Sequence, residues 1–217
     1  MNDNLSGSKK IDGFIYPLYP DMVSKGFFLN DNFLMDLSFS ATKKTMKNIQ
    51  NKALELASNA LSWTDEAIQK FTSLESLPEP LDCKPGCHYC CYNLPMVTPP
   101  EALLIGYHVE KNFTNQEQKE ISDRVNKIFE RINGISPYEI PMMRHELPCI
   151  FLEDGMCMVY SVRPAVCRTC TSTSSEHCKI IFETRNHRAR LRCYQQIREI
   201  FHTVQTDLVN RSKEMGC

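Results

Sequence analysis

The residues of this chain that could do chemistry are concentrated in two cysteine-rich stretches. The first has four thiols within nine residues, Cys83-Lys84-Pro85-Gly86-Cys87-His88-Tyr89-Cys90-Cys91, at the spacing C-x3-C-x2-C-C. The second runs from 149 to 178 and contains Cys149, Cys157, Cys167, Cys170 and Cys178. Thiolates are soft ligands that select zinc, copper(I) and iron–sulfur clusters, and such close spacings let a short loop bring several sulfurs to one centre. The two stretches therefore predict a single metal or iron–sulfur site.

The number of cysteines bears on the kind of site. Cys90 and Cys91 are adjacent, and because neighbouring side chains diverge, binding of both to one ion is awkward. Either one of them has a second metal or redox role, or the site holds several metals. A tetrahedral zinc ion needs four ligands, and the excess of thiols favours a cluster or two metal centres. The candidate ligands are Cys83, Cys87, Cys90, Cys91, Cys149, Cys157 and Cys167, with Cys178 next.

Basic residues lie close to these cysteines. Several thiolates around a metal leave negative charge that cations or N–H donors must offset. We expect Arg163 and Arg168 to contact the cofactor. His88 and His177 could be ligands, but we expect them to hydrogen-bond beside the site or to lie on the surface. The basic residues within four positions of a candidate ligand are Lys84, His88, Arg163, Arg168 and Lys179.

Composition limits the classes of function. The 217 residues include 25 Lys and Arg against 26 Asp and Glu, a net charge of -1 that gives no basic field for nucleic acid. No stretch reaches the roughly 18 apolar residues of a membrane span, and residues 1–10 do not resemble a secretory signal. The 11 cysteines are many for a reducing compartment, where thiols serve metals or redox chemistry. We therefore expect a cytoplasmic protein with reduced thiols, and no nucleic-acid or membrane partner.

The rest of the chain predicts a mainly α fold, a single helical domain whose loops build the cysteine site. We expect an irregular arm over residues 1–40, which packs on the surface or docks a protein partner, and a helical segment over 41–78. The cysteine-cluster domain then spans 79–213 and ends in a long helix. The apolar residues of 42–76 recur at helical spacing, so we expect Trp63 in the core; Ser62 and Thr64 could divide this helix.

Two capping boxes mark the helices between the cysteine stretches. Thr98-Pro99-Pro100-Glu101 opens a predicted helix to about residue 111, and Thr114-Asn115-Gln116-Glu117 opens another that Asn133-Gly134 ends. Apolar residues at a spacing of three and four predict one long amphipathic helix over 180–210. We expect the cysteine site to lie between the helices at 98–133 and 180–210.

Four ordered blocks carry a resemblance to a known family. The triplet C-x3-C-x2-C also occurs in radical S-adenosylmethionine enzymes, but the alternating strands and helices of their barrel are not predicted here. Four blocks together resemble the CxxCxxCC cysteine-cluster family. They are the cysteine motif at 83–91, Leu147-Pro148-Cys149-Ile150-Phe151-Leu152, Gly155-Met156-Cys157-Met158-Val159-Tyr160 and Arg163-Pro164-Ala165-Val166-Cys167-Arg168. This is the YkgJ-type zinc- or iron-chelating domain, and the likeness covers roughly residues 80 to 180.

The resemblance implies metal binding and leaves the role open. An iron–sulfur cluster is favoured, a 4Fe–4S cluster first, with Zn2+ as the alternative. One branch of the family, the flagellin lysine N-methylases, implies methyl transfer to a protein substrate from S-adenosylmethionine. A structural zinc module for protein interaction is the third alternative. We assign no role to Cys170, and we expect Cys193 to be a small buried residue.

Overall fold

The computed structural model describes residues 13–14, 43–74, 77–136, 138–186 and 189–216. The predicted arm therefore lies outside the described residues, apart from the two-residue strand β1 (Gly13–Phe14). Residues 13–14 pair antiparallel with β4 (Leu191–Arg192) in the second half of the chain.

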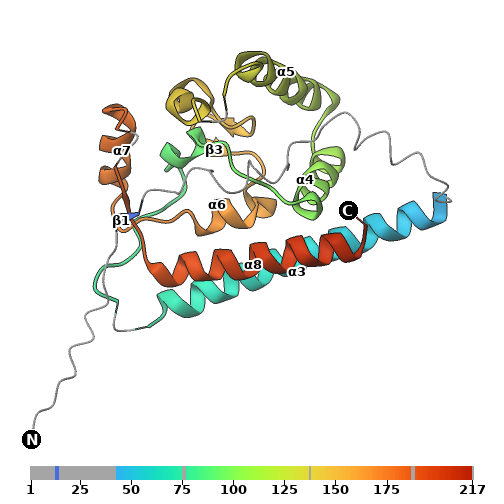
Figure 1. Ribbon diagram of the computed structural model, residues 1–217, viewed down its shortest axis with the longest axis horizontal. Helices are drawn as coiled ribbons and strands as arrows, with labels where there is room; N and C mark the ends of the chain where they lie inside the picture. The colour runs from blue at the N-terminus through green and yellow to red at the C-terminus, as the bar shows by residue number, and fades with distance from the viewer. Residues whose placement is uncertain (1–12, 15–42, 75–76, 137, 187–188, 217) are drawn as a thin grey trace, which may run out of the picture.

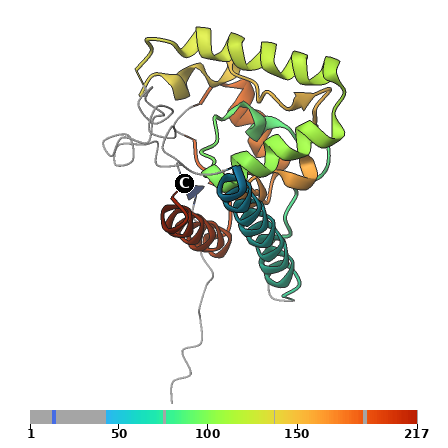
Figure 2. The same ribbon diagram turned by 90° about the vertical axis from the view of Figure 1, so that its right-hand side faces the viewer.

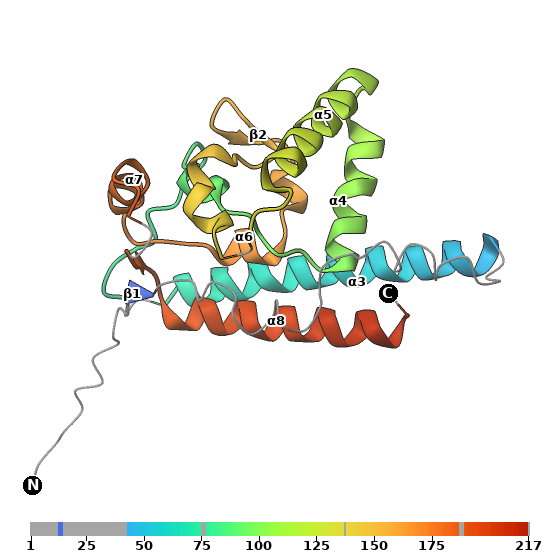
Figure 3. The same cartoon turned by 45° about the horizontal axis from the view of Figure 1, so that its top comes forward.

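Two long antiparallel helices form one layer of the molecule. These are α3 (Lys43–Thr72) and α8 (Gln195–Glu214), which lie side by side along their length in Figures 1 and 3. Figure 2 shows the same pair below the rest of the described chain. A buried cluster of Leu61, Val204 and Leu208 joins the two helices and includes Ala165 from the second layer. The helix pair is thus the base on which the cysteine loops rest.

The second layer holds the cysteine stretches, four shorter α-helices and three 3-10 helices among the described residues. Helix α4 (Pro99–Asn112) contacts α3, and α6 (Ala165–Thr169) lies against both α3 and α8. Helix α5 (Asn115–Ile132) runs along the outer side, and α7 (Ser175–Glu183) stands at one end (Figure 1). Short 3-10 helices and one hairpin complete the second layer. The 3-10 helices are η1 (Tyr89–Tyr92), η2 (Ile140–Glu146) and η3 (Tyr160–Val162), and the hairpin pairs β2 (Leu152–Glu153) with β3 (Met156–Cys157). The described chain is therefore mainly α, as predicted.

Both predicted capping boxes are present. The Glu101 carboxylate accepts from the N–H of Thr98 (2.9 Å) and from its hydroxyl (2.7 Å), and Glu117 accepts from Thr114 in the same way. Glu101 is buried and also accepts from the N–H of Ala165 at 2.8 Å. One carboxylate thus satisfies donors at the starts of both α4 and α6, which fixes these helices to each other.

Three local predictions are wrong. Helix α3 is continuous through Ser62 and Thr64, and the buried Thr64 hydroxyl donates to the carbonyl of Ala60 at 2.7 Å. Trp63 is 47% exposed, because Leu61 and Thr64 occupy the side of the helix that is covered.

The single helix predicted over 180–210 is two helices. Helix α7 ends at Glu183, Arg185 takes a left-handed backbone conformation (φ 52°), and the chain then extends into β4 before α8 begins. Pairing of β4 with β1 requires this extended segment, and helical spacing in the sequence does not reveal it. The predicted site between the helices at 98–133 and 180–210 therefore has two helices, α7 and α8, in place of the second one.

A second apolar cluster anchors the approach to the first cysteine stretch. Tyr194 is 1% exposed and packs edge-to-face on Phe71, with ring centroids 5.3 Å apart, and next to Ile197. Its hydroxyl donates to the carbonyl of Glu79 (2.6 Å) and accepts from the Glu79 N–H (3.0 Å). This pair of bonds fixes the chain four residues before Cys83 to the start of α8.

Candidate metal centre

The first cysteine loop is held against the segment that leads into α7. Gly86 has φ 88°, a conformation that a residue with a side chain rarely adopts, and it reverses the chain inside the motif. The Asp82 N–H donates to the carbonyl of Ser172 (2.9 Å), and the Ser172 N–H donates to Cys83 Sγ (3.2 Å). The hydroxyl of Ser175, and then its N–H, bind the Asp82 carboxylate and lower the pKa of that group. Two segments about 90 residues apart are thereby tied together beside Cys83.

Ser172 also reaches Cys178. The serine is 2% exposed, and its hydroxyl donates to the carbonyl of Ser174 and accepts from the Ser174 N–H, both at 3.1 Å. It also lies close enough to Cys178, in the first turn of α7, to lower the pKa of that thiol, which burial raises. Ser174 caps that helix by accepting from the N–H of His177 at 3.1 Å. Ser172 is therefore a link between Cys83 and Cys178.

The second half of the motif is held against the β2–β3 hairpin. Cys90 and Cys91 lie in η1, and the N–H of Cys149 donates to the carbonyl of Cys91 at 2.7 Å. Cys157 lies in β3, directly opposite Leu152 of β2. The hairpin thus places Cys149, at its start, and Cys157, on its return strand, next to Cys91.

The tip of this hairpin touches the first loop. Asp154 (φ 48°) and Gly155 (φ 76°) form the turn in left-handed conformations. A Cβ atom on Gly155 would lie 3.3 Å from His88 Nδ1 and 3.9 Å from the carbonyl of Gly86. The two cysteine-rich stretches therefore meet closely here, as the sequence predicted.

The described thiols fall into two groups according to their dominant neighbours. The α7 group is Cys83, Cys87 and Cys178, and the hairpin group is Cys91, Cys149, Cys157 and Cys167. Within the α7 group, the charges of the other two members raise the pKa of Cys83, after the larger effect of burial. Within the hairpin group, Cys149 and Cys157 act in the same way on Cys167. The charge of Cys90 raises the pKa values of members of both groups, so the two groups adjoin each other at Cys90.

Cys90 lies next to both groups. Its thiolate accepts hydrogen bonds from the thiols of Cys170 and Cys91, which hold the pKa of Cys90 well below its usual range. Cys91, as a donor to this thiolate, has a raised pKa. The positive charge of Arg163 favours the thiolate further.

Sequence reasoning assigned no role to Cys170, although it belongs to this site. The spacing Cys167-x2-Cys170 is a common spacing of metal ligands and is a signal that was present.

Most of the thiols are protonated near neutral pH. Burial raises the pKa of Cys83 to about 11 and that of Cys167 to about 12, and it also raises the pKa values of Cys87, Cys149 and Cys178. Cys83 is exposed as a residue, so the raised value reflects the protein atoms around its thiol rather than complete burial. The ten described cysteines are all free thiols. A metal ion that binds here must displace protons.

The thiols are near one another without forming a finished coordination shell. Over the described ranges, no three His, Cys, Asp or Glu side chains are placed so that they could hold one metal ion as they stand. The donor set nevertheless fits zinc or iron, since thiolates are the ligands that these metals take in structural and cluster sites. Small movements of the loops and side chains must therefore accompany binding.

The two arginines predicted to contact a cofactor differ in their surroundings. Arg163 stacks on the ring of Tyr160, with 4.1 Å from its guanidinium carbon to the ring centroid, and its charge favours the thiolates of Cys90 and Cys167. Arg168 is 6% exposed, and its guanidinium donates to the carbonyls of Ser161 (2.5 Å) and Arg163 (2.8 Å) and to Asp65 on α3. Arg163 is thus placed for the charge-balancing role, whereas Arg168 connects the Cys167 segment to α3.

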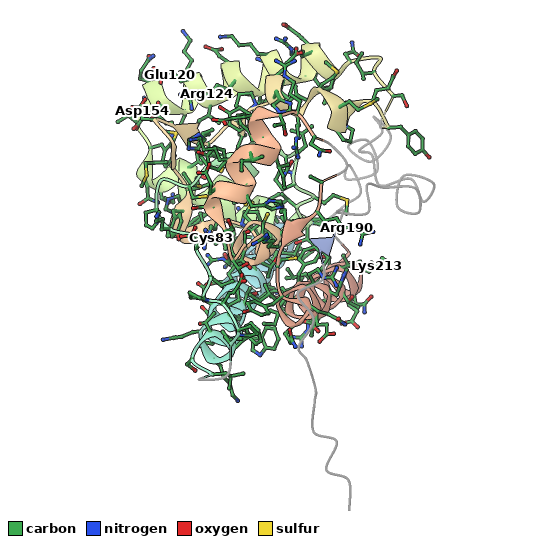
Figure 4. All side chains as sticks on the ribbon, turned by 90° about the vertical axis from the view of Figure 1, so that its left-hand side faces the viewer. Cys83, Glu120, Arg124, Asp154, Arg190 and Lys213 are labelled. Atoms are coloured by element: carbon green, nitrogen blue, oxygen red, sulfur yellow. The ribbon has the colours of Figure 1, made fainter. Side chains whose placement is uncertain are left out.

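The remaining charged candidates have ordinary partners. His88 Nδ1 lies 3.1 Å from the carbonyl of Gly86, and His177 Nε2 lies 3.0 Å from that of Arg190. The exposed Lys84 pairs loosely with Asp82 at 3.9 Å. Figure 4 shows Cys83 nearer to the α3–α8 pair than Asp154 at the hairpin tip.

Two cavities in the described part of the chain lie away from the thiols. A groove of about 690 Å³ between α3 and α8 is lined by residues such as Trp63 and Arg211, and a hollow of about 130 Å³ adjoins Arg168. Neither is lined by a cysteine. Within the described part of the chain, no helix is long and apolar enough to cross a membrane.

A family model described as "CxxCxxCC: Putative zinc- or iron-chelating domain" matches residues 82–198, more than half of the chain. The chain belongs to the CxxCxxCC family. The match covers both cysteine stretches and reaches the first turn of α8, beyond the part in which the resemblance was recognised from sequence. No curated protein and no solved structure matches the chain. Membership of the CxxCxxCC family supports metal binding by this chain, with zinc or iron as the metal.

Proposed function

We propose that this CxxCxxCC protein holds an iron–sulfur cluster, a 4Fe–4S cluster first, through thiolates of both cysteine stretches. The observation that carries the proposal is the contact of the two cysteine stretches, through the bond from the Cys149 N–H to the Cys91 carbonyl and the bond from the Ser172 N–H to Cys83 Sγ. Four thiolates are the usual ligand set of such a cluster, and the described thiols exceed that number. Arg163 supplies positive charge beside them, as an anionic cluster requires.

A bound cluster would supply one-electron chemistry, and this chain's own residues would set its surroundings. The hairpin and the first loop would cover the cluster, because Gly155 already lies against His88. The N–H of Ser172, which donates to Cys83 Sγ, would stabilise that sulfur as a thiolate. The proposed role is redox, or support of a protein-modification reaction on a protein partner.

Anaerobic purification with metal and sulfide analysis tests this function. We expect absorption near ~400 nm and iron and sulfide in near-equal amounts. Cys157→Ser should reduce both, whereas Cys217→Ser, which changes a cysteine outside both cysteine-rich stretches, should leave both unchanged. A colourless protein that carries zinc and no sulfide would refute the cluster.

A structural zinc module for protein interaction is the second candidate. Its support is that the cysteine layer is built from loops and short helices, whereas the base layer is a pair of long helices joined by a buried apolar cluster. Small layers of this kind often depend on metal for folding. Chelation should then abolish the fold of the cysteine layer, measured by loss of protection of its amides in hydrogen exchange. Retained protection after complete loss of zinc would refute this candidate.

Methyl transfer from S-adenosylmethionine to a protein substrate remains a prediction from the family resemblance. Its test is calorimetric titration of the metal-loaded protein with S-adenosylmethionine. Absence of heat and of protection from thermal unfolding would count against it.

A further inference from the structure

Arg124, on α5, binds the turn that leads into the β2–β3 hairpin. Its Nη1 donates to the carbonyls of Ile150 at 3.1 Å and of Leu152 at 3.4 Å. Its other terminal nitrogen donates to the Glu153 carboxylate at 2.9 Å. A guanidinium has five donors in a fixed planar arrangement, so one side chain can bind several acceptors of the same turn. Arg124 therefore fixes the backbone that follows Cys149.

A second arginine of α5 binds the other end of the same segment. Arg131 Nε donates at 3.1 Å to the carboxylate of Glu146, three residues before Cys149. Arg124 and Arg131 are seven residues apart, about two turns of an α-helix, and so lie on one face of α5. The later arginine binds the earlier residue, so the segment 146–153 runs in the direction opposite to the helix. Cys149 lies between the two points of attachment.

Helix α5 is in turn connected to the helical base through α4. Gln118, in the first turn of α5, donates from its side-chain amide to the carbonyl of Phe113 at 2.9 Å, just after α4 ends. Helix α4 contacts α3, and the buried carboxylate of Glu101 joins the start of α4 to α6. Figure 4 shows Arg124 and Asp154 on the same side of the cysteine layer. The position of the hairpin relative to the base is therefore set in part by side chains of α5.

The segment that α5 holds presents two of the candidate ligands. The Cys149 N–H donates to the carbonyl of Cys91 at 2.7 Å, and Cys157 returns on β3 opposite Leu152. Over the described ranges the thiols do not form a finished coordination shell, so binding requires some movement. A residue that orders the ligand segment beforehand raises the affinity for metal, because less conformational freedom is lost on binding.

We infer that Arg124 is a positioning residue for the metal centre, with Arg131 as a weaker counterpart. The inference rests on the proposed metal-binding function and deepens it, because it names a helix outside both cysteine stretches on which the centre depends. The Arg124 side chain is 31% exposed and that of Arg131 is 53% exposed. Exposed ion pairs contribute little, so the two carbonyl bonds of Arg124 carry most of the effect.

Zinc affinity of the reduced full chain, measured by competition with a chelator, tests this role. Arg124→Met should bind zinc about tenfold more weakly than the wild type, as expected when a group that orients ligands is removed. Arg124→Lys should also bind zinc more weakly, because a lysine ammonium can keep the pair with Glu153 but lacks the planar fork that binds both carbonyls. Arg131→Met should have a smaller effect than Arg124→Met.

Two control variants separate the carbonyl bonds from charge alone. Glu153→Gln removes the ion pair of Arg124 and leaves the carbonyl bonds, so its affinity for zinc should equal that of the wild type. Arg211→Met removes an exposed arginine that pairs with Asp207 on α8, and it should likewise bind zinc normally.

Two further readouts distinguish positioning from general stability. In the Co2+-loaded chain, thiolate-to-metal absorption should be weaker for Arg124→Met, because fewer thiolates reach the ion. In hydrogen exchange of the metal-free chain, the amides of 149–158 should exchange faster in this variant, and those of α3 and α8 should not.

The outcomes that would overturn the inference are distinct from failure of the proposed function. Wild-type zinc affinity in Arg124→Met and Arg124→Lys would overturn it, and so would an equal loss in Arg211→Met. If circular dichroism shows that Arg124→Met has lost its helices, Arg124→Lys compared with Glu153→Gln decides, and equal affinities of these two would overturn the inference. A wild-type chain that binds neither zinc nor iron would refute the proposed function itself.

Discussion

Replacement of Arg168 by methionine should destabilise the protein far more than replacement of its acidic partner. Arg168 is almost fully buried and donates to two backbone carbonyls, those of Ser161 and Arg163, as well as to Asp65. Hydrogen bonds from a charged group contribute about 1.5–3 kcal/mol each, so Arg168→Met should cost at least about 3 kcal/mol for the two carbonyls. The Asp65 side chain is 55% exposed, and such ion pairs contribute only about 0–1 kcal/mol. Asp65→Asn should therefore cost less than about 1 kcal/mol.

Urea unfolding and thermal unfolding of the metal-free variants, each followed by circular dichroism at 222 nm, measure this difference in the free energy of unfolding. For a domain of this size, about 1 kcal/mol corresponds to about 2–4 °C in melting temperature, so Arg168→Met should melt about 6–12 °C below the wild type. Equal effects of the two substitutions, or a loss below about 1 kcal/mol for Arg168→Met, would refute the reasoning. If the arginine contacted a bound cofactor, as its position in the sequence suggested, its replacement would alter the loaded protein and leave the metal-free protein unchanged.

Three further substitutions or conditions have definite expected outcomes. Gly155→Ala should weaken zinc retention and lower the free energy of unfolding by about 1–2 kcal/mol, because the turn requires a left-handed conformation. Gly106→Ala, where α4 has open space for a methyl group, should leave the free energy of unfolding unchanged or raise it by up to about 1 kcal/mol. Equal effects at the two sites would contradict the argument. Glu101→Gln should destabilise the protein by about 2 kcal/mol, because an amide cannot accept all three hydrogen bonds of the buried carboxylate. Glu117→Gln, in the exposed capping box of α5, should destabilise it by less than about 1 kcal/mol. Thermal unfolding of the two variants compares these effects. Zinc binding at pH 7 should release protons in proportion to the number of thiols bound, because burial raises the pKa values of Cys83 and Cys167 to about 11 and about 12. The affinity for zinc should therefore fall as the pH decreases. An affinity that calorimetry finds to be independent of pH would show that the thiols are already ionised.

Structural features that depend only on residues close together in the sequence could be predicted from the sequence. The capping boxes at Thr98 and Thr114 are local hydrogen-bond patterns, and both are present as predicted. The spacing of the cysteines likewise predicted that the two stretches converge, because short loops restrict where sulfurs can go. The family, the mainly α fold and the class of metal followed from these same residues.

Features set by tertiary contacts were not predictable. An apolar pattern in α3 is compatible with several registers of burial, and the packing of α8 selects Leu61 and Thr64 instead of Trp63. The break between α7 and α8 depends on the pairing of β4 with β1 and on a left-handed Arg185, and the sequence between the two helices has no glycine or proline to mark it. Arg168 lies beside a cysteine in the sequence, yet its side chain contacts Asp65, 103 residues away. The boundary predicted near residue 79 and the assignment of metal ligands remain predictions.

Helices α3 and α8 precede and follow the cysteine stretches in the sequence, which has a consequence for chain entropy. The two helices pack together although about 120 residues separate them in the sequence. A metal that joins Cys83 to Cys178 bypasses most of that loop and leaves about 30 residues to be closed. This is a shortening of about two doublings, which reduces the entropic cost of closure by ~1 kcal/mol. A metal in the upper layer would thus stabilise the helix pair without touching either helix, by shortening the loop that connects them.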